Sequence, residues 1–414
     1  MSKKRLLIFT HEYPPFSGGI ASYAAELARA AADSGLEVHV VAPDYGRKWR
    51  PETTGGNLLV HRTRASQYNR KRLPWMLCEV LYHLNRGPWD YVHAADIAYI
   101  TVLAFVARFS SLKFLGTAHG TDILSLRDSF SAALLCNGNP YAYCDRVLCN
   151  SHFTRDLLHQ TFPSLSRDRS LVTHLGVNSF WLEEDYEGYL PLIKNNLAIG
   201  SRERVVLTVS RIDRRKGHLA VIDALDQCWF QGVRDIHYVI VGATSDGPYE
   251  DELKSRVKTS PFPITLAGFM EKTELRALYR NAKIFCMPGI PVEDRIEGFG
   301  LAYLEAAACS LPCIGTDLGG VAEVIRDQET GILLSSAEPA LLCAAIRSLL
   351  IDEPRRRSMA TEAHTWARSF TWSRCALLSY GHSDSPRDDN RLCAKEDSQE
   401  GRHSVARERG QSSL

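Results

Sequence analysis

Two carboxylates eight residues apart, Glu297 and Glu305, bracket a glycine-rich turn and the start of a predicted helix. The backbone amides of Phe299, Gly300 and Leu301 would present N–H groups and the positive end of the helix dipole to a phosphate. Each oxygen of a carboxylate accepts a hydrogen bond, so these acids suit the vicinal hydroxyls of a sugar. Helix capping could place one acid near a helix start, but it does not account for the whole run.

Four cations, Arg211, Arg214, Arg215 and Lys216, cluster between another predicted strand and the next helix. Their mutual repulsion would be relieved by a diphosphate, which accepts bidentate guanidinium contacts and a point-charge ammonium contact. A solvated basic turn is the other interpretation. The cluster indicates an anion site if the turn faces a cleft.

The first part of the chain carries weaker signals. Gly18 and Gly19 open a predicted helix, where glycines let the backbone approach a ligand, although a plain turn explains such a pair equally well. His119 and Asp122 follow another strand. A histidine there could hydrogen-bond a sugar hydroxyl, and a purely structural histidine is the equal alternative.

Short β-rich runs alternate with helical ones around these residues. Strands joined by helical crossovers specify a parallel sheet covered on both faces, so the predicted fold class is α/β with Rossmann-like, doubly wound sheets. In the first half we expect strands at Leu6–Thr10, Val38–Val41, Tyr91–His93, Phe114–Ala118 and Val147–Asn150.

A second β/α series begins near residue 201. Its expected strands are Arg204–Ser210, His237–Val241, Ile264–Leu266, Ile284–Met287 and Pro312–Thr316. Its expected helices are Gly217–Trp229, Glu250–Lys258, Lys272–Asn281, Leu301–Ser310 and Val321–Asp327. Ligands of open parallel sheets bind beyond the carboxyl ends of the strands, so two such domains predict a cleft that holds the chemistry.

The length of 414 residues is typical of two domains. We predict a first domain over 1–185, a linker over 186–200 and a second domain over 201–380. Residues 381–414 carry alternating charges and few large apolar side chains, so we expect a disordered tail.

The formal net charge of +1 gives no global field for nucleic acid, so we expect no nucleic-acid partner. Eleven irregularly spaced cysteines indicate reduced thiols of a cytoplasmic protein. The apolar run after the basic start is too short for a signal peptide, and the stretch Ile97–Ala107 is about half the roughly 20 residues of a spanning helix.

The stretch Arg47–Arg72 holds eight Lys or Arg residues against one acid, Glu52, with Trp49 and Trp75 alongside. Cationic segments with interfacial aromatics bind anionic lipid at about 1 kcal/mol per basic residue. A peripheral attachment to the inner face of the cell membrane is one interpretation, and a solvated loop is the other.

The chain resembles glycosyltransferase family 4, the retaining enzymes of the GT-B fold, over roughly residues 5 to 372. The fold implied is two Rossmann-like domains facing each other across a cleft. The resemblance rests on Gly18-Gly19, Trp89–Ala94, His119–Asp122, Leu175–Asn178, Ser210-Arg211, Lys216-Gly217, Ala267-Gly268-Phe269, Glu297–Glu305 and Gly319–Glu323. One departure is the final helix begun at Phe370–Leu378, which gives way to the charged tail.

The resemblance implies roles for residues of the second domain. Arg211 and Lys216 would bind the donor diphosphate and stabilise the charge of the departing nucleotide. Glu305 would hold the ribose hydroxyls, and Glu297 would hold hydroxyls of the transferred sugar. The amides of Phe299, Gly300 and Leu301 would face the phosphates, and the backbone at Gly268 and Phe269 would meet the base.

In the first domain, the resemblance implies that His119 lies over the donor sugar and that Gly18 and Gly19 close onto the phosphates or the acceptor. Asp122 would lie on the acceptor side. The catalytic residues implied are therefore His119, Glu297, Arg211 and Lys216. The acceptor would be a saccharide or a lipid-linked saccharide.

The family's retaining pattern implies that leaving-group departure and acceptor attack occur on one face. No D-x-D pair occurs in the sequence, so we expect no metal and no cofactor besides the donor. Asp294-Arg295-Ile296 favours GDP-mannose. A UDP-glucose or UDP-GlcNAc transferase, a nucleotide-sugar epimerase and a non-catalytic nucleotide-sugar-binding protein are the alternatives.

Overall fold

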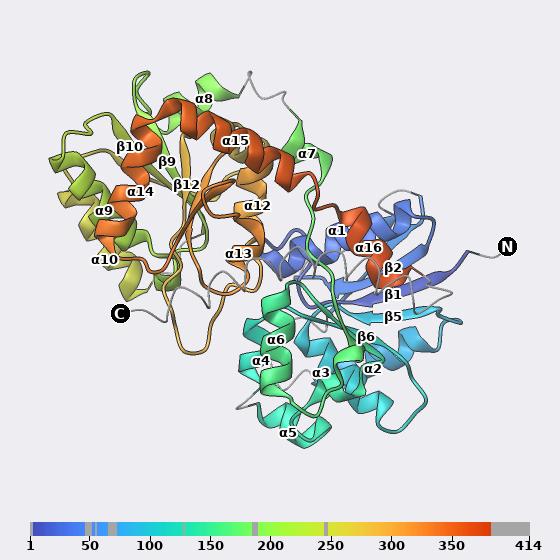
Figure 1. Cartoon of the computed structure of the whole chain (residues 1–414). Coiled ribbons are helices and arrows are strands. Elements are labelled where there is room, and N and C mark those ends of the chain that lie inside the picture. The colour runs from blue at the N-terminus through green and yellow to red at the C-terminus, as the bar shows by residue number, and fades with distance from the viewer. Residues whose placement is uncertain are drawn as a thin grey trace.

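The computed structural model describes residues 3–45, 52–53, 56–64, 73–126, 129–183, 189–243 and 247–381. They form two α/β units, each built on a largely parallel sheet (Figure 1). The predicted fold class is therefore confirmed. The stretch Arg47–Arg72, proposed to meet a membrane, and the tail after residue 381 lie largely or wholly outside the described residues.

The first sheet has eight strands in the order β3-β4-β2-β1-β5-β6-β7-β8. All neighbouring strands run parallel except β3 and β4. The strands are β1 (Arg5–Phe9), β2 (Glu37–Pro43), β3 (Glu52–Thr53), β4 (Leu58–Thr63), β5 (Tyr91–Ala94), β6 (Leu115–Ala118), β7 (Arg146–Cys149) and β8 (Ser170–Val172). Central β1 is buried from Leu6 to Phe9, as expected for a strand covered on both faces.

Helices cover both faces of this sheet. They are α1 (Gly19–Asp33), α2 (Leu73–Leu84), α3 (Ile97–Ala107), α4 (Thr121–Ser125), α5 (Phe130–Cys136) and α6 (His152–Thr161), with short 3₁₀ turns at Pro140–Tyr143 and Arg167–Arg169. The most apolar stretch of the sequence becomes α3, which packs against α2 and α5. No helix in the described ranges is both long and apolar enough to cross a membrane.

The second sheet has six parallel strands in the order β11-β10-β9-β12-β13-β14. They are β9 (Arg204–Val209), β10 (Ile236–Val241), β11 (Ile264–Gly268), β12 (Ile284–Cys286), β13 (Cys313–Thr316) and β14 (Gly331–Leu334). Its helices are α9 (His218–Phe230), α10 (Pro248–Thr259), α11 (Lys272–Asn281), α12 (Leu301–Ala308), α13 (Val321–Val324), α14 (Pro339–Ile351) and α15 (Glu353–Ala367). All five predicted strands of this half are present.

The chain passes between the domains twice. The outward passage includes α7 (Ser179–Leu182) and α8 (Leu190–Asn196), which lies within the predicted linker. The return passage leads into α16 (Trp372–Tyr380). The two passages touch, because the Val177 amide donates to the Phe370 carbonyl at 3.0 Å.

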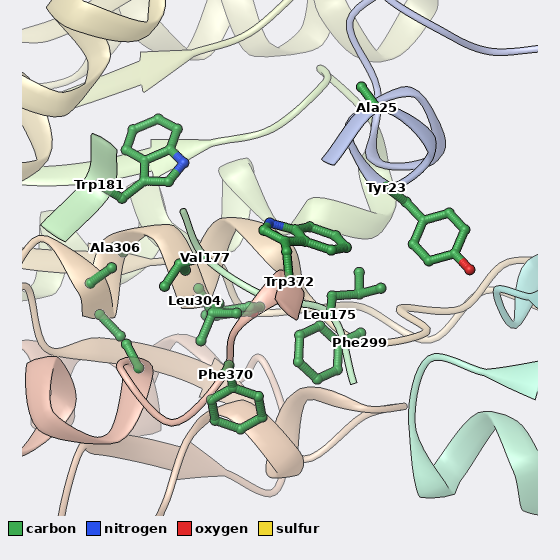
Figure 2. Packing of buried hydrophobic residues seen from close by; sticks show 14 of the residues in the cluster. Tyr23, Ala25, Leu175, Val177, Trp181, Phe299, Leu304, Ala306, Phe370 and Trp372 are labelled. Atoms are coloured by element: carbon green, nitrogen blue, oxygen red, sulfur yellow. The ribbon is translucent and has the colours of Figure 1, made fainter. Parts of the chain in front are cut away.

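Helix α16 packs against α1 of the first domain (Figure 1). The Tyr380 hydroxyl lies 2.6 Å from Nδ1 of His93 on β5, and both groups are buried. The predicted boundary at residue 380 therefore assigns to the second domain a helix that packs on the first. One cluster of buried apolar side chains, including Phe299, Phe370 and Trp372, joins the two domains (Figure 2).

Candidate active site

A side-chain cap and a close backbone contact fix the conformation of the cationic turn that follows β9. Residues Arg214–Lys216 form a 3₁₀ turn that begins at Asp213, whose carboxylate accepts from the Arg215 amide at 3.0 Å. Gly217 has a φ of +74°, and a Cβ there would lie 2.1 Å from the Pro288 carbonyl oxygen. The turn therefore needs glycine at this position. It directs the side chains of Arg215 and Lys216 toward Glu297.

Glu297 is the partner of two of these cations. Its Oε2 lies 2.5 Å from Lys216 Nζ and 3.0 Å from Arg215 Nη1. Burial alone would raise the pKa of Glu297, but the two positive charges and their hydrogen bonds bring that pKa below its ordinary value. The carboxylate is therefore ionised at neutral pH. The same residues line a small pocket with Tyr303.

Arg215 is the member of this cluster that the sequence did not single out. Its side chain is buried, whereas Arg211, assigned to the diphosphate from the resemblance, is exposed on the same loop. The charge of Arg211 acts on Glu12 of the first domain. The signal that could have identified Arg215 is its place directly before Lys216, within a turn that starts at a capping Asp.

The turn before α12 is built from glycines and leaves the helix start uncapped. Gly300 has a φ of +98°, and α12 begins at Leu301 with no side-chain cap. Phe299 is buried and its ring contacts Phe370, with centroids 5.8 Å apart. The side chain of Phe299 therefore packs in the core, which leaves only its backbone for the predicted contact with phosphate.

Glu305 lies about one turn after Leu301, the first residue of α12. Burial raises the pKa of Glu305 to about 7, with Lys272 acting to lower it and Glu26 of α1 acting to raise it. A carboxyl group with this pKa changes charge near neutral pH. A ligand that donates hydrogen bonds to it would favour the ionised form.

The first-domain residues lie on the loop after β6. The His119 ring has Nε2 2.8 Å from the Ala95 carbonyl oxygen and meets the Tyr23 ring edge to face at 5.0 Å. Asp122 accepts from the His119 amide at 2.9 Å and from the Tyr141 hydroxyl at 2.7 Å. Both oxygens of Asp122 are thus engaged in positioning the loop, a role its acceptor-side assignment did not anticipate.

The His119 loop touches the glycine turn of the other domain. A Cβ on Gly298 would lie 1.9 Å from the His119 carbonyl oxygen, so only glycine fits between them. The Ser151 hydroxyl donates to the Gly298 carbonyl at 2.6 Å, and Thr121 Oγ1 donates to the Ile296 carbonyl at 3.0 Å. The structure therefore brings His119 and the Glu297 turn to one interdomain junction.

The remaining predicted donor residues border this junction or lie at a sheet edge. Gly18 is extended, with φ −178°, and α1 begins at Gly19 without a side-chain cap. The close neighbours of Gly18 are Phe16 and Glu12, whose Oε2 would lie 3.1 Å from a Cβ on Gly18. At the end of β11, Gly268 has a φ of +66° and Phe269 is 61% exposed.

Three side chains outside this cluster could share a cation by spacing alone: ligand atoms of His152, His174 and Glu323 lie within 4.8 Å of one another. The Glu323 oxygens, however, accept from the amides of His152 and Phe153 at 2.9 Å and lie 2.7 Å from His174 Nε2. Arg155 Nη2 lies 3.2 Å from His152 Nδ1, which places a positive charge beside the group. The arrangement fits a link between α13 and the start of α6 better than a metal site.

Comparisons with known proteins identify the family of the chain. Residues 17–179 match the family model described as Glycosyltransferase Family 4, and residues 191–366 match the model described as Glycosyl transferases group 1. The chain is 37% identical to a D-inositol 3-phosphate glycosyltransferase of Paenarthrobacter aurescens, over 87% of this chain and 91% of that protein.

A GDP-mannose-dependent alpha-(1-6)-phosphatidylinositol monomannoside mannosyltransferase of Mycolicibacterium smegmatis is 27% identical over 87% of this chain and 93% of its own length. Among solved structures, Anabaena HepE in complex with UDP and glucose superposes with a TM-score of 0.72 at 17% identity. That superposition covers 91% of this chain and 98% of HepE, and it shows a shared fold.

Proposed function

Because the chain belongs to glycosyltransferase family 4 and is a glycosyltransferase of the GT-B type, we propose that it transfers mannose from GDP-mannose to a hydroxyl of a saccharide or lipid-linked saccharide. The product would have the anomeric configuration of the donor. The activity would serve the synthesis of a cell-surface polysaccharide or glycolipid.

The observation that carries this proposal is the ion-paired cluster of Glu297, Lys216 and Arg215 beside the uncapped start of α12. Without a donor, the Glu297 carboxylate neutralises the cations. A diphosphate would compete for Lys216, which frees Glu297 to accept hydrogen bonds from sugar hydroxyls. The cluster thus has one carboxylate that can accept hydrogen bonds from the sugar and two cations that can donate hydrogen bonds to the leaving group.

In the proposed reaction, the bond between the sugar anomeric carbon and the diphosphate oxygen breaks as the acceptor oxygen bonds to that carbon on the same face. The nucleoside diphosphate leaves with the electron pair, and the acceptor proton passes to its phosphate oxygen. Lys216, Arg211 and the α12 amides would stabilise the charge that grows on the leaving group. One such preorganised donor is worth roughly 3 kcal/mol.

The use of mannose is supported by the GDP-mannose named for the mycobacterial relative and by Asp294-Arg295-Ile296 ahead of Glu297. Because the HepE structure contains UDP and glucose, UDP-sugars are tested as well. Nucleotide release should be measured from GDP-mannose, UDP-glucose, UDP-GlcNAc and UDP-galactose in the presence of a crude lipid and saccharide extract. We expect turnover with GDP-mannose and full turnover in excess EDTA.

The matched variants are Lys216→Ala and Glu297→Ala, with Lys258→Ala on the exposed face of α10 as the control. The first two should lose at least 100-fold in turnover while circular dichroism shows that they remain folded, and the control should match the wild type. Normal rates in both site variants would remove the site assignment. Loss of turnover in EDTA that Mn²⁺ or Mg²⁺ restores would remove metal independence.

We also propose that the first domain attaches to an anionic bilayer, where a lipid-linked acceptor would reside. Large apolar side chains are more than half exposed on α2, after α3 and on α5: Trp75, Tyr82, Phe109, Phe130 and Leu134. Arg86 and Arg108 lie over the rings of Tyr82 and Phe109, so cations accompany the apolar groups. Interfacial aromatics beside cations favour anionic lipid.

Sedimentation with vesicles of phosphatidylglycerol and phosphatidylcholine tests this attachment. The double variant Trp75→Ser and Phe130→Ser should remain in the supernatant, while Phe230→Ser should sediment as the wild type does. Phe230 is the control because it is 74% exposed on α9 of the other domain. Equal sedimentation of all three proteins would contradict the proposal.

A further inference from the structure

A carboxylate that the donor site does not use lies at the carboxyl end of β1. Glu12 is partly buried, and its Oε1 lies 3.6 Å from Nε2 of His11. The Glu12 amide donates to the hydroxyl of Thr10 at 3.2 Å, which fixes the backbone. Among the described residues, no side-chain donor lies within 3.5 Å of its carboxylate oxygens.

His11 is itself held by a buried acid. Its Nδ1 lies 2.8 Å from Oδ1 of Asp96, and its amide donates to Oδ2 of Asp96 at 2.7 Å. Burial acts against charge on both groups, but their mutual attraction raises the pKa of His11 and lowers the pKa of Asp96. The carboxylate of Asp96 therefore holds the His11 ring, and Nε2 on the other edge of that ring faces Glu12.

The glycine turn leaves room for this carboxylate. Gly18 has an extended backbone that any residue could adopt, so its conformation does not require glycine. A Cβ there would lie 3.1 Å from Glu12 Oε2, tighter than most real contacts. The missing side chain at Gly18 therefore lets the turn approach the Glu12 carboxylate.

Two groups of the proposed reaction centre act on the same carboxylate. Burial raises the pKa of Glu12 above its ordinary value, while His11, His119 and Arg211 of the opposite domain act to lower it. His119 of the first domain and Arg211 of the second are therefore charged or titratable groups that act on Glu12.

We propose that Glu12 binds a hydroxyl group of the acceptor, a saccharide or cyclitol with vicinal hydroxyls. A neutral hydroxyl donor supplies the hydrogen bond that the carboxylate lacks and leaves the charge balance unchanged. Glu12 belongs to the first domain, opposite Lys216 and Glu305, so it meets the acceptor rather than the nucleotide. This inference rests on the proposed function and extends it to the acceptor side.

Direct binding tests the inference without turnover. Methyl α-D-mannopyranoside and myo-inositol 1-phosphate are the two probes, observed by saturation-transfer NMR with GDP or UDP present at saturating concentration. The wild type should bind at least one probe, and Glu12→Ala should weaken that binding about 10- to 100-fold, the range for a lost hydrogen bond to a charged group. Glu12→Gln, which keeps an acceptor oxygen, should recover part of it.

Nucleotide binding separates this inference from the proposed function. Glu12→Ala should bind GDP or UDP within twofold of the wild type by calorimetry, as should Glu329→Gln, an exposed control on the second domain. Absence of probe binding to the wild type, or wild-type probe binding by Glu12→Ala, would overturn the role of Glu12. Absence of nucleotide binding to the wild type would instead overturn the proposed function. Circular dichroism of each variant confirms that it folds.

Discussion

The two domains hold their charged groups near the interdomain junction differently. On the second-domain side, Glu297 is in direct contact with Lys216 and Arg215, so its charge is compensated before any ligand binds. On the first-domain side, Glu12 faces His11 at 3.6 Å, beyond hydrogen-bond distance. Under the proposed function, the first arrangement would exchange partners to bind a diphosphate, whereas the second would accept a hydroxyl without losing a contact.

The largest expected effect comes from removing Arg215 from the ion-paired cluster of the second domain. Arg215→Ala should lower kcat/KM 100- to 1000-fold, because Glu297 would lose a buried partner and the leaving group would lose a nearby cation. Its sequence neighbour provides the control, since Arg214 is exposed and pairs with Glu252 at 2.6 Å. Arg214→Ala should stay within twofold of the wild type. Equal effects of the two changes would mean that the turn contributes only general positive charge.

The next largest effect is a pH dependence of stability that comes from Glu305 of the second domain. The pKa of Glu305 in the folded protein is about 7 against an ordinary 4.5, so the acid form is favoured by folding and stability is lost as pH rises from 4.5 through 7. Glu305→Gln should therefore raise the free energy of unfolding at pH 8 by up to about 3 kcal/mol. Urea denaturation at pH 8 and pH 4 measures this, and the gain should disappear at pH 4.

The same variant should also change nucleotide binding. If ribose hydroxyls bind the ionised form, the wild type should lose up to tenfold in nucleotide affinity for each pH unit below 7. Glu305→Gln should bind more weakly than the wild type at pH 8, with little dependence on pH. A wild-type affinity that stays constant between pH 6 and pH 8 would contradict the placement of Glu305 at the ribose.

The smallest expected effect concerns Glu323, which links the second domain to the first. Glu323 of α13 accepts from two amides at the start of α6, and the Gln variant keeps the shape but loses the charge. Glu323→Gln should lower the free energy of unfolding at pH 7 by about 2 kcal/mol, with Glu329→Gln unchanged. Because His174 and the amides lower the pKa of Glu323 against the effect of burial, this contribution should be lost only as pH falls below about 4.5. An unchanged unfolding midpoint would mean that the link adds no stability.

The sequence predicted the elements whose residues lie close together along the chain. The alternation of strands and helices predicted every strand that precedes a candidate donor-site residue, and the run from Glu297 to Glu305 predicted a helix that begins at Leu301. Strands β3, β4, β8 and β14 were missed. Strands β3, β8 and β14 lie at sheet edges, and β4 lies next to an edge. None of the four contains a candidate site residue.

The parts that the sequence did not predict depend on contacts between distant residues. His11 and Asp96 are 85 residues apart, and no local pattern indicates that they pair. Asp122 looked like an acceptor residue because it follows His119, yet its oxygens are used by the His119 amide and by Tyr141. Arg215 was one of four similar cations, and only the fold of the turn distinguishes the buried one.

The two chain segments that connect the domains limit how the domains can move relative to each other. The backbone bridge between Val177 and Thr371 holds both connections side by side, and the contact between Tyr380 and His93 fixes the far end of the returning helix. Any displacement of one domain that slides the two connections past each other would therefore have to break this backbone bridge.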